Sequence, residues 1–216
     1  FGARESEEYG EDEYILETTS PSYTWTSFPS GSWTVNVQAI PSDTEKFSNS
    51  EIVAVPVKVD APALAPMTAG SITQEDMEFL YAVTEGKSID GTAIPANIYY
   101  KGFLFTGRSG KASKFNSSEN YGAFFNTGGS SDFTQDKAGR TIRFMAAGPG
   151  KLTYVVCSNG GDNRTAGVAV NNIEDGALAT TQPQPTSMPA NWDAWTLEKD
   201  LSTVAAGDVI DLYSTK

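Results

Sequence analysis

The chain has no histidine and a single cysteine, and these two absences exclude whole classes of chemistry. Without histidine there is no Ser-His-Asp or Cys-His nucleophile, and the usual zinc and non-haem iron sites lose their commonest ligand. Cys157 alone forms neither an intrachain disulfide nor a thiolate cluster. No stretch approaches the ~20 apolar residues of a membrane helix. We therefore predict no metal, no other cofactor and no transmembrane segment.

Positive charge is scarce as well. The 216 residues hold 15 Lys and Arg against 27 Asp and Glu, a net charge of −12, which argues against nucleic acid as a partner. Residues 1–17 alone carry seven carboxylates against Arg4. This run is either a calcium-attracting or partner-binding arm, or a solvated stretch of like charges. It lacks the alternating ligands and central glycine of an EF-hand.

Side-chain alternation predicts strands in the first 60 residues. Residues 33–40 and 51–59 alternate in the way that is typical of a strand with one buried face, and 23–28 form a third short strand. Pro56 has no N–H for a ladder, so the strand that contains it belongs at a sheet edge. A Pro/Ala stretch at 60–66 then favours an extended linker.

We place a domain boundary at this linker. Residues 1–60 form the acidic segment and a first domain, 61–70 the linker, and 71–216 a second domain. A capping-box-like spacing at 71–76 allows one helical turn, but the apolar run 79–83 that follows predicts a strand.

The second domain reads as strands separated by turns. Gly148-Pro-Gly150 is the strongest turn signal. Short strands at this spacing, with glycine-rich turns, are typical of a β-sandwich or a jelly roll. The expected strands cover residues 98–105, 121–125, 141–146, 151–157, 164–170, 195–201 and 208–213.

The string Phe28-Pro-Ser-Gly-Ser-Trp-Thr-Val-Asn-Val-Gln-Ala39 resembles the second half of a fibronectin type III module. The resemblance covers residues 13–60 and implies an Ig-like sandwich. Trp33 stands where that family has its corner tyrosine, and strands before Glu13 are absent. Half a sandwich exposes a large apolar face, so either upstream residues are missing or a protein partner completes the sheet.

Residues 76–216 resemble a β-sandwich module of secreted Bacteroides-type, polysaccharide-associated proteins. The resemblance rests on the strings 139–156 and 206–214, and on the strand start at Asn163-Arg164. It implies an all-β, jelly-roll-like domain that is extracellular or at the bacterial cell surface. Since the chain opens without methionine, we read it as a mature or trimmed form from which a signal or lipid anchor has been removed.

Three aromatic residues, Trp192, Trp195 and Tyr99, are candidates for stacking on a sugar ring. Trp192 and Trp195 follow a proline-rich loop that could hold them in place, and Tyr99 and Tyr100 point to opposite faces of one strand. The alternative is structural: Trp195 and one of the tyrosines as core residues, and Trp192 as a loop cover.

Two charged residues in one loop complete the candidate ligand site. Asp162 and Arg164 could contact a sugar hydroxyl or carboxylate, since an arginine fork binds both carboxylate oxygens. The alternative is a turn with a surface ion pair, which contributes little to stability. Calcium at Asp162 and Asn159 falls short of the usual six or more ligands.

No carboxylate pair sits in a recognisable catalytic motif, and we expect no enzyme. The sequence therefore predicts a non-catalytic extracellular or cell-surface module that binds, or is associated with, a polysaccharide or surface glycan. The alternative is a structural or cell-adhesion protein whose β-sandwiches contact other proteins.

Overall fold

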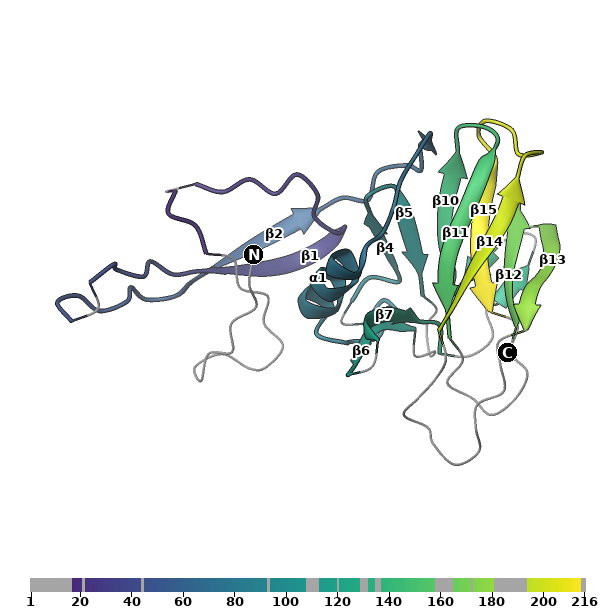
Figure 1. Cartoon of the computed structure of the whole chain (residues 1–216). Coiled ribbons are helices and arrows are strands. Elements are labelled where there is room, and N and C mark those ends of the chain that lie inside the picture. Colours follow the sequence, from purple (N-terminus) through teal and green to yellow (C-terminus); the bar gives the residue numbers. More distant parts are fainter. Residues whose placement is uncertain are drawn as a thin grey trace, which may run out of the picture.

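The protein is built mainly from antiparallel strands, as a computed structural model shows (Figure 1). The structure describes residues 17–20, 22–43, 45–92, 94–107, 113–119, 121–128, 132–134, 137–157, 165–171, 173–180 and 194–214. Within these ranges there is one helix, α1 (Gln74–Thr84). The predicted all-β class is confirmed.

A seven-stranded sheet forms the centre of the body. Six strands follow the order β13-β12-β15-β10-β5-β4, and β3 pairs in parallel with the end of β10. β3 (Pro66–Met67) comes from the predicted linker, and the division into domains stays a prediction. The other strands are β4 (Asn97–Tyr100), β5 (Phe103–Thr106), β10 (Ile142–Ala146), β12 (Thr165–Val170), β13 (Ile173–Thr180) and β15 (Val209–Ser214).

Three further strand pairs surround this sheet. Leu152 and Tyr154 of β11 pack against its buried residues, which makes this end of the body sandwich-like. The finer jelly-roll arrangement stays a prediction. The pairs are β11 (Gly150–Val156) with β14 (Trp195–Leu201), β6 (Lys114–Ser118) with β7 (Gly122–Asn126), and β8 (Asp132–Thr134) with β9 (Lys137–Gly139).

Helix α1 covers the other end of the body and corrects the predicted strand at 79–83. Thr73 caps it through a reciprocal capping box with Asp76. The buried side chains Asp76, Phe79, Leu80 and Thr84 recur at helical spacing, so they share one face. The helix cap and the helical spacing of the buried side chains thus outweigh the β-propensity of residues 79–83.

The core beneath α1 is aromatic. The rings of Phe105, Phe115 and Phe125 lie with centroids 4.9–5.4 Å apart, and Phe105 and Phe115 are fully buried. These rings come from β5, β6 and β7, so they join the small β6–β7 pair to the central sheet.

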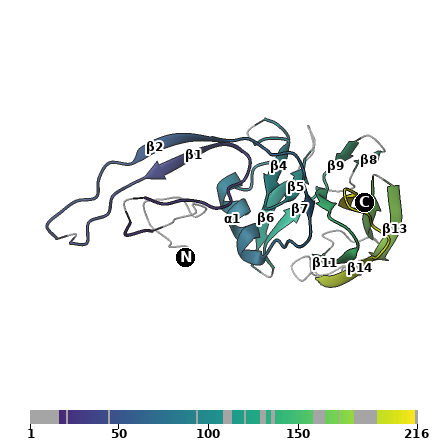
Figure 2. The same cartoon turned by 90° about the horizontal axis from the view of Figure 1, so that it is seen from above.

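The N-terminal part is a two-stranded hairpin, β1 (Gly31–Val37) with β2 (Val53–Val59), which projects from the body (Figures 1 and 2). Pro56 lies in an edge strand, as predicted. The expected strand at 23–28 is wrong: this segment forms no ladder, and its aromatic rings pack on the hairpin and on each other instead.

Candidate functional site

The predicted ligand residues do not form a common site in the part of the chain that the structure describes. Trp192, Asp162 and Arg164 lie outside the described residues. Trp195 begins β14 opposite Val156. Tyr99 is half-buried in β4, an end strand of the central sheet, so these two aromatics belong to different sheets.

The root of the hairpin is fastened to the edge of β4. The Ser30 N–H donates to the Tyr99 carbonyl at 3.0 Å, and the Tyr99 N–H donates to Ser30 Oγ at 2.8 Å. The indole N–H of Trp33 donates to the Pro29 carbonyl at 2.9 Å. Tyr99 therefore has a backbone role that the sequence did not indicate.

Gly31 allows the chain to turn from this root into β1. Its φ of +142° is a conformation that L side chains rarely adopt. A Cβ at Gly31 would also lie 2.9 Å from the Trp33 ring, closer than real Cβ contacts. The glycine thus lets the indole fold over the start of the strand.

One face of the hairpin is made of valines. The register places Val35 opposite Val55 and Val37 opposite Val53, with Trp33 opposite Val57 nearer the root. Because side chains alternate along a strand, the other face carries small and polar residues; these are Ser32, Thr34, Asn36, Ala54, Pro56 and Lys58.

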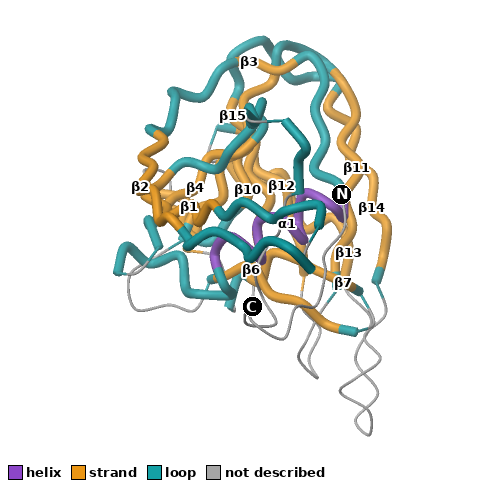
Figure 3. The backbone as a smooth tube through the Cα atoms, turned by 90° about the vertical axis from the view of Figure 1, so that its left-hand side faces the viewer, coloured by secondary structure: helices purple, strands orange, loops and turns teal. Residues whose placement is uncertain are grey.

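We call the first of these surfaces the valine face: Val35, Val37, Val53, Val55, Val57 and Val59. Its exposure rises toward the tip. Val57 and Val59 are half-buried, whereas Val55 is 40% exposed and Val53 59%. Near the tip, Ile40, Phe47 and Ile52 are exposed as well. Figure 3 views the molecule from the side on which the hairpin projects. A sheet face this apolar is ordinarily covered.

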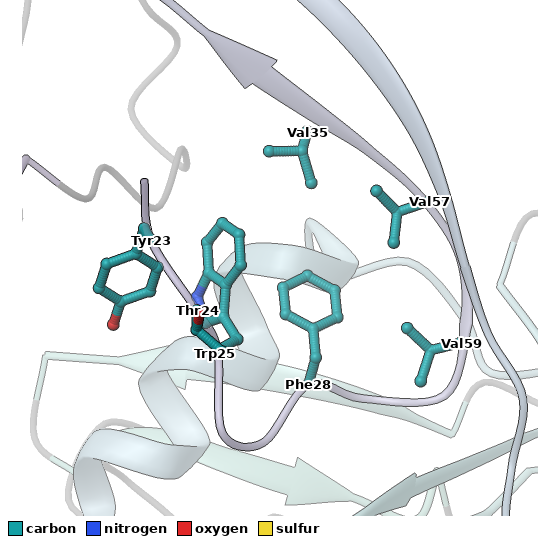
Figure 4. Close-up of a pocket in the computed structure, with 7 residues that line it drawn as sticks. All are labelled: Tyr23, Thr24, Trp25, Phe28, Val35, Val57 and Val59. Carbon is teal, nitrogen blue, oxygen red and sulfur yellow. The ribbon is translucent and has the colours of Figure 1, made fainter. Parts of the chain in front are cut away.

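The segment 22–28 covers the root half of the valine face. Tyr23, Trp25 and Phe28 stand in a row, with ring centroids 5.0 and 5.3 Å apart, edge to face (Figure 4). Phe28 continues the row to Phe79 of α1 at 5.7 Å. The rings thus connect the hairpin to the core of the body.

Between these rings and the valines lies an open groove of about 310 Å³. Figure 4 shows the rings of Trp25 and Phe28 turned toward Val35, Val57 and Val59. The lining residues are Tyr23, Thr24, Trp25, Phe28, Val35, Val57 and Val59. Among their side chains only the hydroxyls of Tyr23 and Thr24 and the indole N–H of Trp25 are polar. The groove therefore suits an apolar side chain better than a sugar, which needs several hydrogen-bonding partners.

One buried charged group joins α1 to the β4–β5 turn. Asp76 Oδ1 accepts from Lys101 Nζ at 2.5 Å and from the Tyr100 hydroxyl at 3.0 Å, while Oδ2 accepts from the Thr73 N–H. Burial favours the neutral acid, but the hydrogen bonds from Lys101 and the other donors outweigh it and lower the pKa of Asp76. The cluster is satisfied and structural.

A second buried carboxylate ties β10 to β15. Arg143 binds both oxygens of the fully buried Asp211, at 2.8 and 2.9 Å, and the Thr141 hydroxyl adds a bond at 3.1 Å. Such a fork is strong and directional. Its position inside the sheet indicates a structural role.

The Cys157 thiol also bears on chemistry. Burial raises the pKa of the Cys157 thiol, which disfavours the reactive thiolate.

No group of three or more metal-ligating side chains occurs among the described residues. In the same ranges no helix has the length and apolarity to cross a membrane.

Comparison of the chain with protein-family models, with curated proteins and with solved structures finds no match in any of the three. The two family resemblances therefore stay predictions. The valine face and the groove form a candidate functional surface whose residues the sequence did not single out, although half a sandwich predicts an exposed apolar face here. The signal was present in the valines at alternate positions from 53 to 59, within a segment that has too few strands to close a sandwich.

Proposed function

We propose that this chain is a non-catalytic structural or adhesive protein whose β1–β2 hairpin contacts another protein. The observation that carries the proposal is the valine face, which is more than half exposed at Val37 and Val53, on a hairpin that projects from the body. An isolated two-stranded sheet is marginally stable in water, and a third strand or a cover adds stability.

The chemistry of the surface favours a protein over a glycan. Its residues are aliphatic and aromatic, and its groove lacks the convergent amides and carboxylates that orient a sugar. Aromatic anchors in apolar pockets are typical of protein interfaces. The glycan hypothesis keeps its basis in the sequence, at Trp192, Asp162 and Arg164.

The test is a selection of random twelve-residue displayed peptides against the whole protein. A matched pair of variants separates the two faces of the hairpin. Val37→Thr with Val53→Thr keeps side-chain shape and strand propensity but makes the valine face polar. Asn36→Thr with Ala54→Thr changes the opposite face at neighbouring register positions.

We expect enriched peptides to bind the wild type and the opposite-face variant alike, and to lose affinity for the valine-face variant. Light scattering over a range of protein concentrations, on both variants, detects self-association through the same face. The proposal is overturned if no peptide is enriched and the protein stays monomeric, or if binding is insensitive to the valine-face variant.

A further inference from the structure

The hairpin has two outer edges, and they differ. Neither pairs with a further strand in the part of the chain described. β2 carries Pro56, which lacks a donor, and Lys58, whose side chain is 75% exposed. Proline and lysine are the residues with which natural sheets protect their edges. β1 contains no proline and no charged residue, so its edge is open to an added strand.

The protein itself shows what its valine face accepts. Segment 22–28 lies on the root half in an irregular, unladdered conformation, with aromatic rings at Tyr23 and Trp25, two positions apart. Alternate side chains of an extended chain point to the same side. A strand added beside β1 therefore needs large apolar side chains at every second position if it is to pack against the valines.

The net charge of the hairpin region indicates which residues should flank such a strand. Residues 22–60, which include the hairpin, contain Asp43, Glu45, Glu51 and Asp60 against Lys46 and Lys58, a net charge of −2. A second copy would bring two such negative regions together, whereas a basic segment is attracted by them.

We infer that the hairpin takes up an extended segment of a different protein, apolar at alternate positions and flanked by basic residues, which pairs with the open edge of β1 and extends the valine face. This inference rests on the proposed function and specifies its partner. Main-chain bonds to β1 supply the register, and the alternate side chains on the valine side pack beside Val35 and Val37 toward the exposed tip.

The experiment uses synthetic peptides and the whole protein. The probe is a fluorescein-labelled peptide that alternates aromatic residues and threonine, as residues 23–26 do, between paired lysines. One control has the same composition with the aromatics placed together, which abolishes the alternation. Another replaces the lysines by glutamates. Anisotropy gives the affinities, and hydrogen exchange locates the protected amides.

We expect the alternating basic peptide to bind about tenfold or more tightly than either control, and the glutamate penalty to shrink at high salt, where charges are screened. Val37→Thr with Val53→Thr should weaken binding about tenfold, and Asn36→Thr with Ala54→Thr should not. Amides of β1 should gain protection on binding.

Three results would overturn the inference while leaving the proposed function standing. In the first, the selected peptides bind through the valine face but lack alternation or basic flanks. In the second, the protein self-associates through that face. In the third, peptide binding protects the amides of β2 from exchange and not those of β1. If neither peptide binding nor self-association is weakened in the valine-face variant, both the inference and the proposed function are overturned.

Discussion

Ser30 and Tyr99 bond to each other twice, once through the Ser30 N–H and once through the Ser30 hydroxyl, 69 residues apart in the sequence. Ser30 is 3% exposed and lies where the hairpin leaves the body. Through these two hydrogen bonds Ser30 is fastened to the outer edge of β4 in the central sheet. It fixes the start of the hairpin while leaving its far end free.

Ser30→Ala removes the acceptor of the Tyr99 N–H. Because that donor is then left without its partner in a half-buried site, we expect the free energy of unfolding to fall by about 1–2 kcal/mol. Urea unfolding followed by circular dichroism measures the change. Ser32→Ala, an exposed position in β1, is the control and should leave stability within about 0.5 kcal/mol of wild type.

Gly31→Ala tests the turn into β1. We expect a loss of about 1–3 kcal/mol, because the substitution combines a strained φ with a Cβ that meets the Trp33 ring. Gly150→Ala is the matched control, since nothing lies within 4 Å of its Cβ position. It should be neutral or raise stability by a few tenths of a kcal/mol. Equal losses in the two variants would contradict the role assigned to Gly31.

Tyr154→Phe tests a buried hydroxyl that has no hydrogen-bond partner among the described residues. Removing it should leave stability unchanged or raise it by up to about 1 kcal/mol. Tyr23→Phe, with an exposed ring, serves as the control. A marked loss of stability in Tyr154→Phe would show that the hydroxyl is bonded after all.

The same residue predicts an alkaline effect. Burial raises the pKa of Tyr154 from 10.0 to about 12. The folded state therefore holds this proton more tightly than the unfolded state, so the group does not change stability with pH below 10, and stability falls as the pH rises from 10 toward 12. Wild type should lose more stability than Tyr154→Phe over that interval in parallel urea titrations.

Asp76→Asn tests the cluster that links α1 to the β4–β5 turn. We expect a loss of about 1–3 kcal/mol at pH 6, because the variant lacks the charged acceptor of Lys101 and of the helix cap. Since the pKa of Asp76 is lowered in the folded state, its contribution is present above 3.8 and is lost as the pH falls through the folded value. The difference in stability between wild type and variant should therefore be smaller at pH 2.5 than at pH 6 in urea unfolding.

The control for this prediction is Asp60→Asn. Asp60 also pairs with a lysine, but its side chain is 84% exposed. Exposed ion pairs contribute little, so the substitution should change stability at neither pH. A constant difference between wild type and Asp76→Asn across the acid range would contradict the proposed cause.

Local patterns predicted most strands, because alternation is recorded in the sequence itself. They predicted 98–105 as one strand, whereas Lys101 and Gly102, both at positive φ, turn it into the hairpin β4–β5. The β-propensity of the run 79–83 predicts a strand, but the capping residues Thr73 and Asp76 start a helix there.

The candidate site was harder to foresee. Alternation at 51–59 indicates that one face of a strand is apolar, but not whether anything covers that face. That depends on how many strands meet it, which is a tertiary property. Tyr23 and Trp25 read as strand residues until the structure showed their rings packed on the hairpin. The ring of Tyr99 makes it a candidate in the sequence, yet in the structure its backbone N–H donates to Ser30 Oγ.

The uncovered valines also bear on the colloidal behaviour of the free protein. Electrostatic repulsion between copies, each with a net charge of −12, opposes aggregation through the exposed aliphatic surface. That protection vanishes near the isoelectric point of about 4.4 and weakens in concentrated salt. Solubility should therefore be lowest near that pH, and the valine-face variant should precipitate less there than wild type.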